Sequence, residues 1–453
     1  MKLSSVSVDK FEKNRSEVYK LVLLLLSAQI AVLVNILPGN FIVYSSFASV
    51  LLLSSYFKSQ DLIKATLLLF VFNGIMRRIA ASDSGYFTEN DILIFLPYVP
   101  IVFLLFKNLK VLKLELKLLV VLYLICIFAL FSIQQSVPNI VWGLVNLIMV
   151  IILGQVSKEY FDEALIAFII RLGLLSAVYI FVQKVSLPEY DVGWCQNRKS
   201  ALVILESCTS SSTRLWGTME SAVNMACFLS VCFLLVTFRN KKTLSIATKA
   251  IQLGVIFVAL FLTGTRTFIF IIPLAYLLGV YFFRKLSIPG FVFGVLSILV
   301  SASLLPNLAL LFDYESRWVS RLDLTNLTGD RSLTDRIGLV ESFKDQLSLK
   351  NLLIGDGLGS KSRGSLAIDN GYLSLVLEIG LPLTVILLII IFMKLKNVQD
   401  FQNPLVLQSW SICILLIFAN ASYVVLTGSS SVYFWVFLFM LNSRGGSDKV
   451  QPK

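Results

Sequence analysis

The chain is dominated by long apolar runs that are separated by short polar islands. Hydrophobic residues make up 57% and charged residues 15% of its 453 residues, whereas a soluble domain usually carries about 25% charged residues. An apolar helix of about 20 residues matches the hydrocarbon core of a bilayer, which is about 30 Å thick. So many runs of this length would overfill the core of a soluble protein. The pattern therefore predicts an all-α polytopic membrane protein.

About fourteen runs qualify as transmembrane helices. Their even number places both termini on one side, and the short basic loops assign that side to the cytoplasm by the positive-inside rule, together with the polar tail 444–453. The predicted spans are 20–37, 40–56, 62–80, 91–106, 115–132, 138–156, 163–183, 215–238, 247–264, 266–283, 287–305, 371–393, 404–422 and 427–443.

Two outer loops, 184–214 and 306–370, are long enough to fold. They divide the spans into three groups, 1–183 with about seven helices, 215–305 with about four and 371–443 with about three. Loops that a rigid scaffold presents tend to carry function. We therefore expect a site beneath these two loops.

The basic residues differ in kind between the two faces. With this topology the inner face carries 19 Lys and 4 Arg, and the outer face carries 5 Lys and 10 Arg. Topology requires positive charge of either kind, but Arg is preferred where a planar fork grips phosphate or carboxylate. The outer excess of Arg indicates an anionic ligand; codon bias is the alternative. The net charge of +12 is explained by topology and predicts no nucleic-acid partner.

Several classes of site are excluded by what the sequence lacks. It contains no His, which removes His-based zinc sites and imidazole-based catalytic triads. It contains no CxxC pair, phosphate-binding P-loop or GxGxxG turn. Cys195 and Cys208 are the two cysteines predicted outside the spans, in an oxidising compartment, so we expect a disulfide between them; two free thiols are the alternative.

The second outer loop supplies most of the candidate anion ligands. Arg317 and Arg321 are four residues apart and would share one face of a helix. A capping-box pattern at Ser332 predicts a helix over 333–347, with Arg331 and Arg336 near its N-terminus, where an anion is favoured. Solvated surface arginines are the alternative interpretation.

Two further candidates lie where spans meet the outer face. Arg266 follows Thr263-Gly-Thr between two spans, a depth at which arginine is costly unless it is paired or hydrated. Arg214 and Glu220 begin the span after the first large loop, and Glu220 is a candidate base. Snorkelling to the headgroups for Arg266, and an ion pair with Arg214 for Glu220, are the alternatives.

A glycine-rich turn precedes the last group of spans. Gly355-Asp-Gly-Leu-Gly-Ser360 predicts tight turns or close backbone approach. It is followed by Asp369-Asn-Gly-Tyr-Leu373, which opens a span. Asp369 is a candidate base or sugar ligand, and a helix N-cap is the alternative role.

Taken together, Thr263-Gly-Thr-Arg266, Leu352-Leu-Ile-Gly-Asp-Gly-Leu-Gly-Ser360 and Asp369-Asn-Gly-Tyr-Leu-Ser-Leu-Val-Leu-Glu-Ile-Gly-Leu381 resemble the O-antigen polymerase and O-antigen ligase superfamily (Wzy and WaaL proteins). The resemblance implies a GT-C-like glycosyltransferase of the bacterial inner membrane with two large periplasmic loops and no cofactor or metal. It also implies that the donor is a glycan on undecaprenyl pyrophosphate and the acceptor a second lipid-linked repeat unit. Membrane lipids, a chain-length regulator and a flippase are the implied partners.

The resemblance also suggests roles for individual residues. Arg266 and Arg336 match the family arginines that grip the pyrophosphate, and Asp369, then Glu220, would take the proton of the acceptor hydroxyl. The other residues expected to contact the substrate are Arg214, Arg317, Arg321, Arg331, Asn370 and Tyr372.

The residue at position 369 favours one branch of the superfamily. Ligases commonly carry His before the Asn-x-Tyr-Leu segment, and this chain carries Asp369 there. A polymerase is therefore favoured. The alternatives are a ligase or protein O-glycosyltransferase of the same superfamily and, from another class, a transporter of polysaccharide or lipid-linked sugar.

Overall fold

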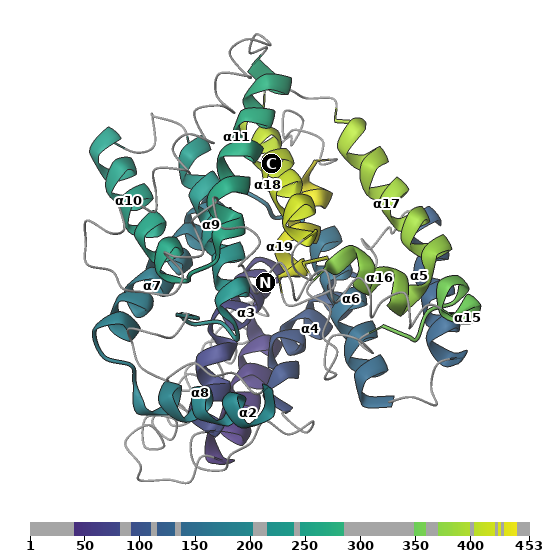
Figure 1. The fold of residues 1–453 in the computed structure, drawn as a ribbon, viewed down its shortest axis with the longest axis horizontal. Coiled ribbons are helices and arrows are strands. Elements are labelled where there is room, and N and C mark those ends of the chain that lie inside the picture. Colours follow the sequence, from purple (N-terminus) through teal and green to yellow (C-terminus); the bar gives the residue numbers. More distant parts are fainter. Residues whose placement is uncertain are drawn as a thin grey trace, which may run out of the picture. The chain divides into compact units, whose positions relative to one another are not determined.

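The computed structural model describes residues 40–81, 92–109, 116–131, 137–202, 215–239, 245–284, 348–358, 370–398, 403–421, 425–426 and 430–441. In these residues every regular element is a helix, which confirms the all-α prediction for the described part of the chain. The chain divides into two compact units. Figure 1 labels most of the helices that make them up. The first holds the described residues up to Leu109 together with 186–202 and 218–220, and the second holds the remainder.

The helices follow the apolar runs closely. In the first unit they are α2 (Asn40–Tyr56), α3 (Ser59–Ala81), the 3-10 helix η1 (Ile92–Tyr98), α4 (Val99–Asn108) and α8 (Glu189–Leu202). In the second unit they are α5 (Leu116–Phe131), α6 (Val137–Ser157), α7 (Glu163–Val185), α9 (Ala222–Phe238), α10 (Ile246–Leu262), α11 (Arg266–Arg284), α15 (Leu349–Leu353), α16 (Gly371–Ile379), α17 (Leu381–Lys396), α18 (Pro404–Asn420) and α19 (Ser431–Met440). The spans expected at 20–37 and 287–305 lie outside the described residues.

One of the described helices, α7, is both long and apolar enough to cross a membrane. The other apolar helical stretches found among the described residues are 10–17 residues long, for example Gly143–Ser157 within α6 and Thr267–Phe282 within α11. A 17-residue helix is about 26 Å long, which is slightly less than the hydrocarbon thickness. The number of spans therefore stays a prediction.

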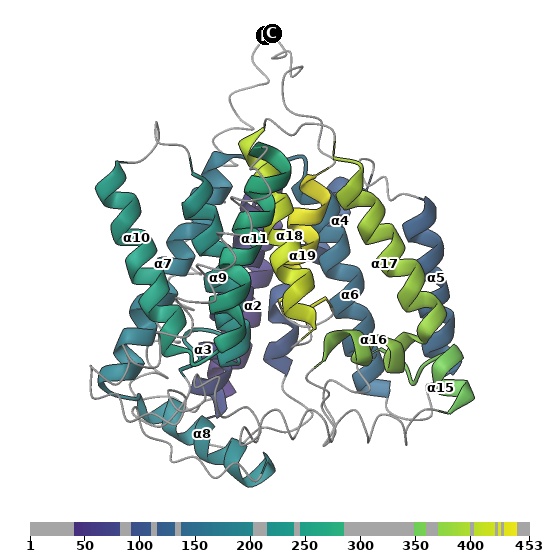
Figure 2. The same ribbon diagram turned by 45° about the horizontal axis from the view of Figure 1, so that its top comes forward.

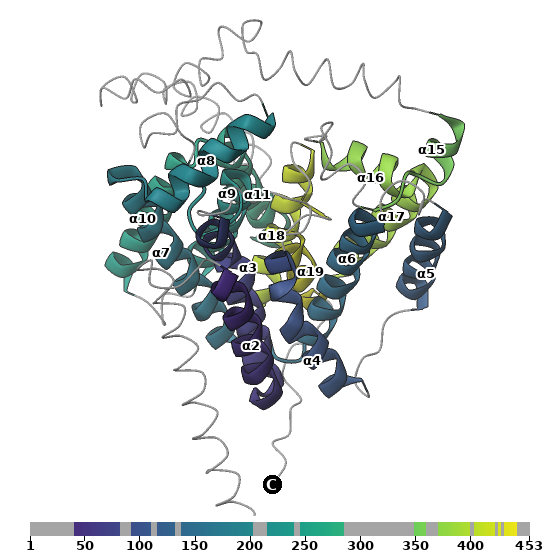
Figure 3. The same cartoon turned by 90° about the horizontal axis from the view of Figure 1, so that it is seen from below.

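The first unit is held together by α2, α3 and α4, which lie side by side (Figure 3). Leu69, Leu93 and Leu96 form a buried cluster between α3 and η1. At the other end of α4, the Lys107 ammonium donates to the carbonyls of Ser54, Ser55 and Phe57 at 3.2, 3.2 and 2.5 Å. Ser54 and Ser55 lie in the last turn of α2 and Phe57 follows it, where carbonyls have no partner within the helix and positive charge is also favoured by the helix dipole.

The second unit is a bundle built around α19, whose residues are all buried. α19 packs against α6 and α18, α18 packs against α11 and α9, and α9 packs against α7 and α10 (Figure 2). α9 and α18 are also largely buried, which explains why Cys227, Cys232 and Cys413 are free and inaccessible.

Two predicted spans are interrupted. The run 215–238 begins with non-helical backbone, and α9 starts only after Ser221, whose side chain accepts from the Asn224 N–H at 3.2 Å. The run 371–393 is two helices, α16 and α17, because Gly380 adopts a φ of +79° between them. In Figure 2, α16 lies at an angle to α17, beside its N-terminal end.

The break at Gly380 is stabilised by the glycine-rich turn predicted from the sequence. The N–H groups of Asp356 and Gly357 donate to the carbonyls of Leu377 and Glu378 at 2.7 and 2.9 Å. Gly355 has a φ of +81°, and a Cβ at this position would lie 2.5 Å from the Glu378 carbonyl carbon. The close backbone approach expected of these glycines is therefore made to the end of α16.

Replacing Gly355 by Ala is expected to destabilise the second unit, because both the φ and the lack of space oppose a side chain. Gly254→Ala is the matched control, because a Cβ at this position in α10 meets nothing within 4 Å. It should be neutral or stabilising by up to about 1 kcal/mol, since Ala is the better helix former. Thermal unfolding of both purified variants tests this, and equal melting temperatures would contradict the role given to Gly355.

Candidate functional site

A cluster of charged side chains lies inside the first unit where three segments meet. Arg77 and Arg78 come from the last turns of α3, Asp191 and Trp194 come from α8, and Glu220 follows in the segment 218–220. In the predicted topology, the end of α3 and both of the other segments belong to the outer face. The first large loop therefore contributes a helix that packs on α3.

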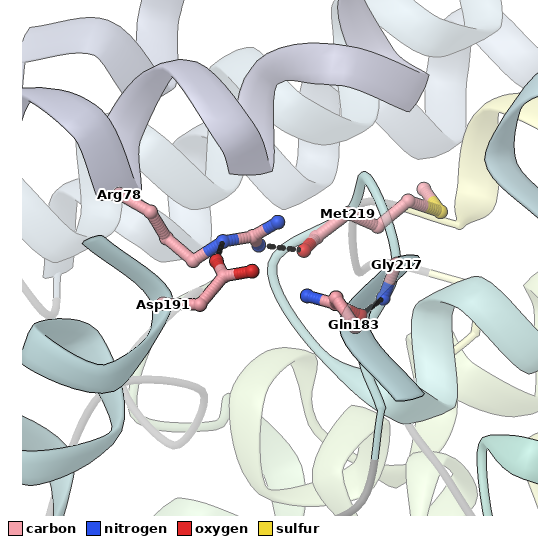
Figure 4. A network of polar contacts seen from close by, with 5 residues as sticks. All are labelled: Arg78, Gln183, Asp191, Gly217 and Met219. Carbon is pink, nitrogen blue, oxygen red and sulfur yellow. Dashed lines mark hydrogen bonds and ion pairs between the residues drawn. The ribbon is translucent and has the colours of Figure 1, made fainter. Parts of the chain in front are cut away.

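Arg78 forms the buried half of this cluster (Figure 4). Its guanidinium and the Asp191 carboxylate have no exposed surface, and Nε lies 2.5 Å from Oδ1. Its Nη1 donates to the carbonyl of Met219 at 2.5 Å. A buried guanidinium needs such partners, because it has lost its hydration. Arg78 thus ties α8 and the 218–220 segment to α3.

The backbone of residues 218–220 lies directly on α3. The N–H of Ile75 donates to the carbonyl of Thr218 at 3.1 Å. Gly74 allows this approach, because a Cβ there would lie within 2.6 Å of the Met219 carbonyl and the Glu220 nitrogen. Immediately upstream, within the second unit, Gln183 Oε1 accepts from the N–H of Gly217 at 2.9 Å (Figure 4). Contacts of the backbone at residues 217–219 therefore fix where Glu220 lies.

Arg77 forms the more accessible half of the cluster. Its Nη1 lies 2.7 Å from Glu220 Oε1, and its guanidinium carbon lies 5.7 Å from the centre of the Trp194 ring. The Arg77 side chain is 8% exposed and the Glu220 side chain is 26% exposed. The partner of Glu220 is thus Arg77, and the predicted alternative partner, Arg214, lies outside the described residues.

Cys195 lies one turn after Asp191 on α8 and is disulfide-bonded. Its predicted partner, Cys208, lies outside the described residues.

A second group of candidates lies in the second unit, around the start of α11. Thr263, Gly264 and Thr265 form a tight turn in which the Thr263 hydroxyl donates to the Leu260 carbonyl at 2.7 Å and Gly264 has a φ of +65°. α11 then begins at Arg266. The turn expected between two spans is therefore present, and the backbone of Arg266 lies at a helix N-terminus.

Contacts near the other end of α11 fix where Arg266 lies in the bundle. Phe282 contacts Trp410, and Gly279 lies against Leu407, so the C-terminal part of α11 packs on the N-terminal part of α18. The two helices are therefore antiparallel, and Arg266 lies at the end where α18 finishes.

Two substrate-binding candidates belong to α16. Asn370 is its N-cap, and its side chain accepts from the N–H groups of Tyr372 and Leu373 at 3.0 and 3.1 Å. The Tyr372 hydroxyl donates to the carbonyl of Ile417, near the end of α18, at 2.7 Å. The cap role considered for Asp369 is thus taken by its neighbour Asn370. The starts of α11 and α16 lie at the same end of α18.

The other predicted site residues lie outside the described residues. They are Arg214, Arg317, Arg321, Arg331, Arg336, Asp369 and Cys208. Among the described residues, no three Cys, Asp or Glu side chains gather closely enough to hold a metal ion.

Three functional candidates were not predicted from the sequence: Arg77, Arg78 and Asp191. One signal was present, because two adjacent arginines close an otherwise apolar run, where an isolated charge is costly. Their carboxylate partners are more than 100 residues away along the chain, and no periodicity in the sequence connects them.

Comparison of the chain with family models and with curated proteins finds no match to either.

Asp191→Asn is expected to lower the free energy of unfolding by about 3–5 kcal/mol, because it leaves the buried Arg78 without its counter-charge. Glu189→Gln, on the exposed side of the same helix, should cost less than about 1 kcal/mol. Unfolding of the purified protein in detergent measures both. A similar small loss in the two variants would show that the buried pair does not stabilise the fold.

Proposed function

We propose that this protein is a polysaccharide polymerase of the O-antigen type in the bacterial inner membrane. It would transfer a growing glycan from undecaprenyl pyrophosphate onto a lipid-linked repeat unit at the outer face. The observation that carries the proposal is the placement of Arg266 at the N-terminus of α11, at the same end of α18 as Asn370 and Tyr372 of α16.

Membrane insertion of the bundle is supported by apolar side chains that remain exposed on its outer helices. Leu175, Val178 and Val182 form one such row along α7, and each is about half exposed, at 56%, 55% and 47%. α17 presents a similar row through Val385, Ile386 and Ile389. Contact with lipid would remove these surfaces from water, whereas an aqueous protein rarely exposes so much contiguous apolar surface.

In the proposed chemistry, negative charge develops on the pyrophosphate leaving group, and arginine side chains stabilise it. The acceptor hydroxyl oxygen bonds to the anomeric carbon while the bond from that carbon to the pyrophosphate oxygen breaks, and the electron pair stays on the pyrophosphate. Arg266, with Arg336, would stabilise this developing charge, as preorganised cationic donors do in general. Arg214 or Arg317 would assist, and Asp369 would accept the hydroxyl proton.

The helix break at Gly380 argues against the transporter alternative. Transporters leave the carbonyls of broken helices open toward a substrate or ion. Here the carbonyls of Leu377 and Glu378 accept from Asp356 and Gly357, so the break is closed by protein. A ligase or protein O-glycosyltransferase would share the donor chemistry, and transfer to lipid A-core or to pilin in vitro would distinguish it.

Arg266→Ala in the native host should convert the polysaccharide ladder to single-repeat product, because the leaving group loses a cationic donor. Arg266→Lys keeps the charge but loses the planar fork, and loss of a donor of this kind lowers kcat roughly 100- to 1000-fold. Gel electrophoresis of the extracted polysaccharide gives the readout.

Arg171→Lys is the matched control, because Arg171 is exposed on α7. It should leave the ladder unchanged. A normal ladder in a well-expressed Arg266→Ala variant would overturn the role given to Arg266.

A further inference from the structure

We propose that Glu220 and Arg77 form a subsite for the hydroxyl groups of an uncharged sugar in the lipid-linked glycan. Glu220 accepts hydrogen bonds from the sugar, and Arg77 positions its carboxylate. That the ligand is a lipid-linked glycan rests on the proposed function. The subsite itself rests on four side chains of the first unit, Arg77, Arg78, Asp191 and Glu220.

The charges of this cluster select the class of ligand. Among the described residues, the two ion pairs join two arginines to two carboxylates, so the charges of these four side chains balance. A diphosphate would be repelled by Glu220, and a cation would be repelled by Arg77. A polyhydroxyl compound has no net charge to repel and donates hydrogen bonds that a carboxylate accepts strongly. The cluster therefore fits a neutral sugar better than it fits the pyrophosphate.

The Arg77–Glu220 pair is not needed to anchor the segment that bears it. Thr218 is already held by the N–H of Ile75, and Met219 is held by Arg78. Enclosing a further ion pair costs hydration free energy, and apolar side chains of similar size often stabilise a protein equally well. A costly pair that adds no necessary anchor indicates a role in binding.

Exposure decides which member of the cluster meets the ligand. Arg78 and Asp191 are fully buried and Arg77 is 8% exposed, whereas Glu220 is 26% exposed. Glu220 contacts Arg77 through Oε1. A carboxylate can accept about four hydrogen bonds, so Glu220 can accept from vicinal hydroxyls while it keeps this partner.

The test measures transfer by the full-length protein in proteoliposomes, with lipid-linked repeat unit as substrate. Glu220→Ala should raise KM about tenfold, the effect of losing a hydrogen bond to a charged group. Glu220→Gln keeps one acceptor oxygen and should raise KM less, with little change in kcat. Glu189→Gln, which removes an exposed carboxylate from α8, is the control and should match the wild type.

A charge-swapped double variant, Arg77→Glu with Glu220→Arg, separates binding from structure. It retains an ion pair but moves the carboxylate away from the sugar. We expect its melting temperature to recover relative to Glu220→Arg alone, while KM stays high. Recovery of KM together with stability would show that the pair is only structural and would overturn the proposal, as would an unchanged KM in a folded Glu220→Ala variant.

Binding of the delipidated repeat-unit oligosaccharide, followed by ligand-observed NMR, distinguishes this proposal from the proposed function. Binding that is lost in Glu220→Ala but kept in Arg266→Ala supports the subsite. If the wild-type protein shows this binding but transfers no glycan, the polymerase proposal is refuted and the subsite is not. The opposite outcome would refute the subsite and leave the polymerase proposal intact. In that outcome transfer requires Arg266, but wild type and Glu220→Ala bind the oligosaccharide equally.

Discussion

The ion pair between Arg78 and Asp191 is fully buried and constrains how the first unit can pack. A guanidinium and a carboxylate with no exposed surface are tolerated only when each replaces the water that the other has lost. Asp191 lies on a helix of the first large loop, and the Met219 carbonyl that also binds Arg78 follows that loop. The end of α3 therefore acquires its stable state only when the loop and the segment 218–220 are both in place. The pair converts a surface loop into part of the core.

The second unit meets a related requirement with backbone groups. A helix that is interrupted inside an apolar bundle leaves carbonyls without partners, and each such group is costly away from water. At Gly380 the turn 355–357 supplies two N–H groups to α16, and glycine permits the contact because no Cβ intervenes. Both units thus use a segment from a long loop between apolar helices to satisfy polar groups at the ends of helices. The two loops that the sequence predicts to be outer therefore contribute structural segments as well as candidate ligands.

The sequence predicts the helices well because segments that form helices in an apolar environment are themselves long runs of apolar residues. The runs behind α2, α6, α7, α10 and α18 match their helices to within a few residues. It predicts the breaks poorly, because residues 215–221 and Gly380 were assigned to single continuous spans, whereas their conformation depends on partners distant in sequence. Glu220 illustrates the same limit. Arg214 was the nearest candidate partner along the chain, but Arg77, more than 140 residues away, lies on the helix against which this segment packs.

These pairings also change how the excess of arginine on the outer face is interpreted. The excess of Arg over Lys among the residues predicted to be outside was interpreted as a sign of an anionic ligand. Arg77 and Arg78 contribute no net charge to that face, because Glu220 and Asp191 neutralise them locally. Counting residue types therefore overstates the positive charge that a diphosphate would meet. Arg266 is placed differently, since it begins a helix whose N-terminal dipole adds to its own charge. On the proposed function, Arg266 would meet the diphosphate of a lipid-linked glycan, and the cluster of Arg77 and Glu220 would meet its sugars.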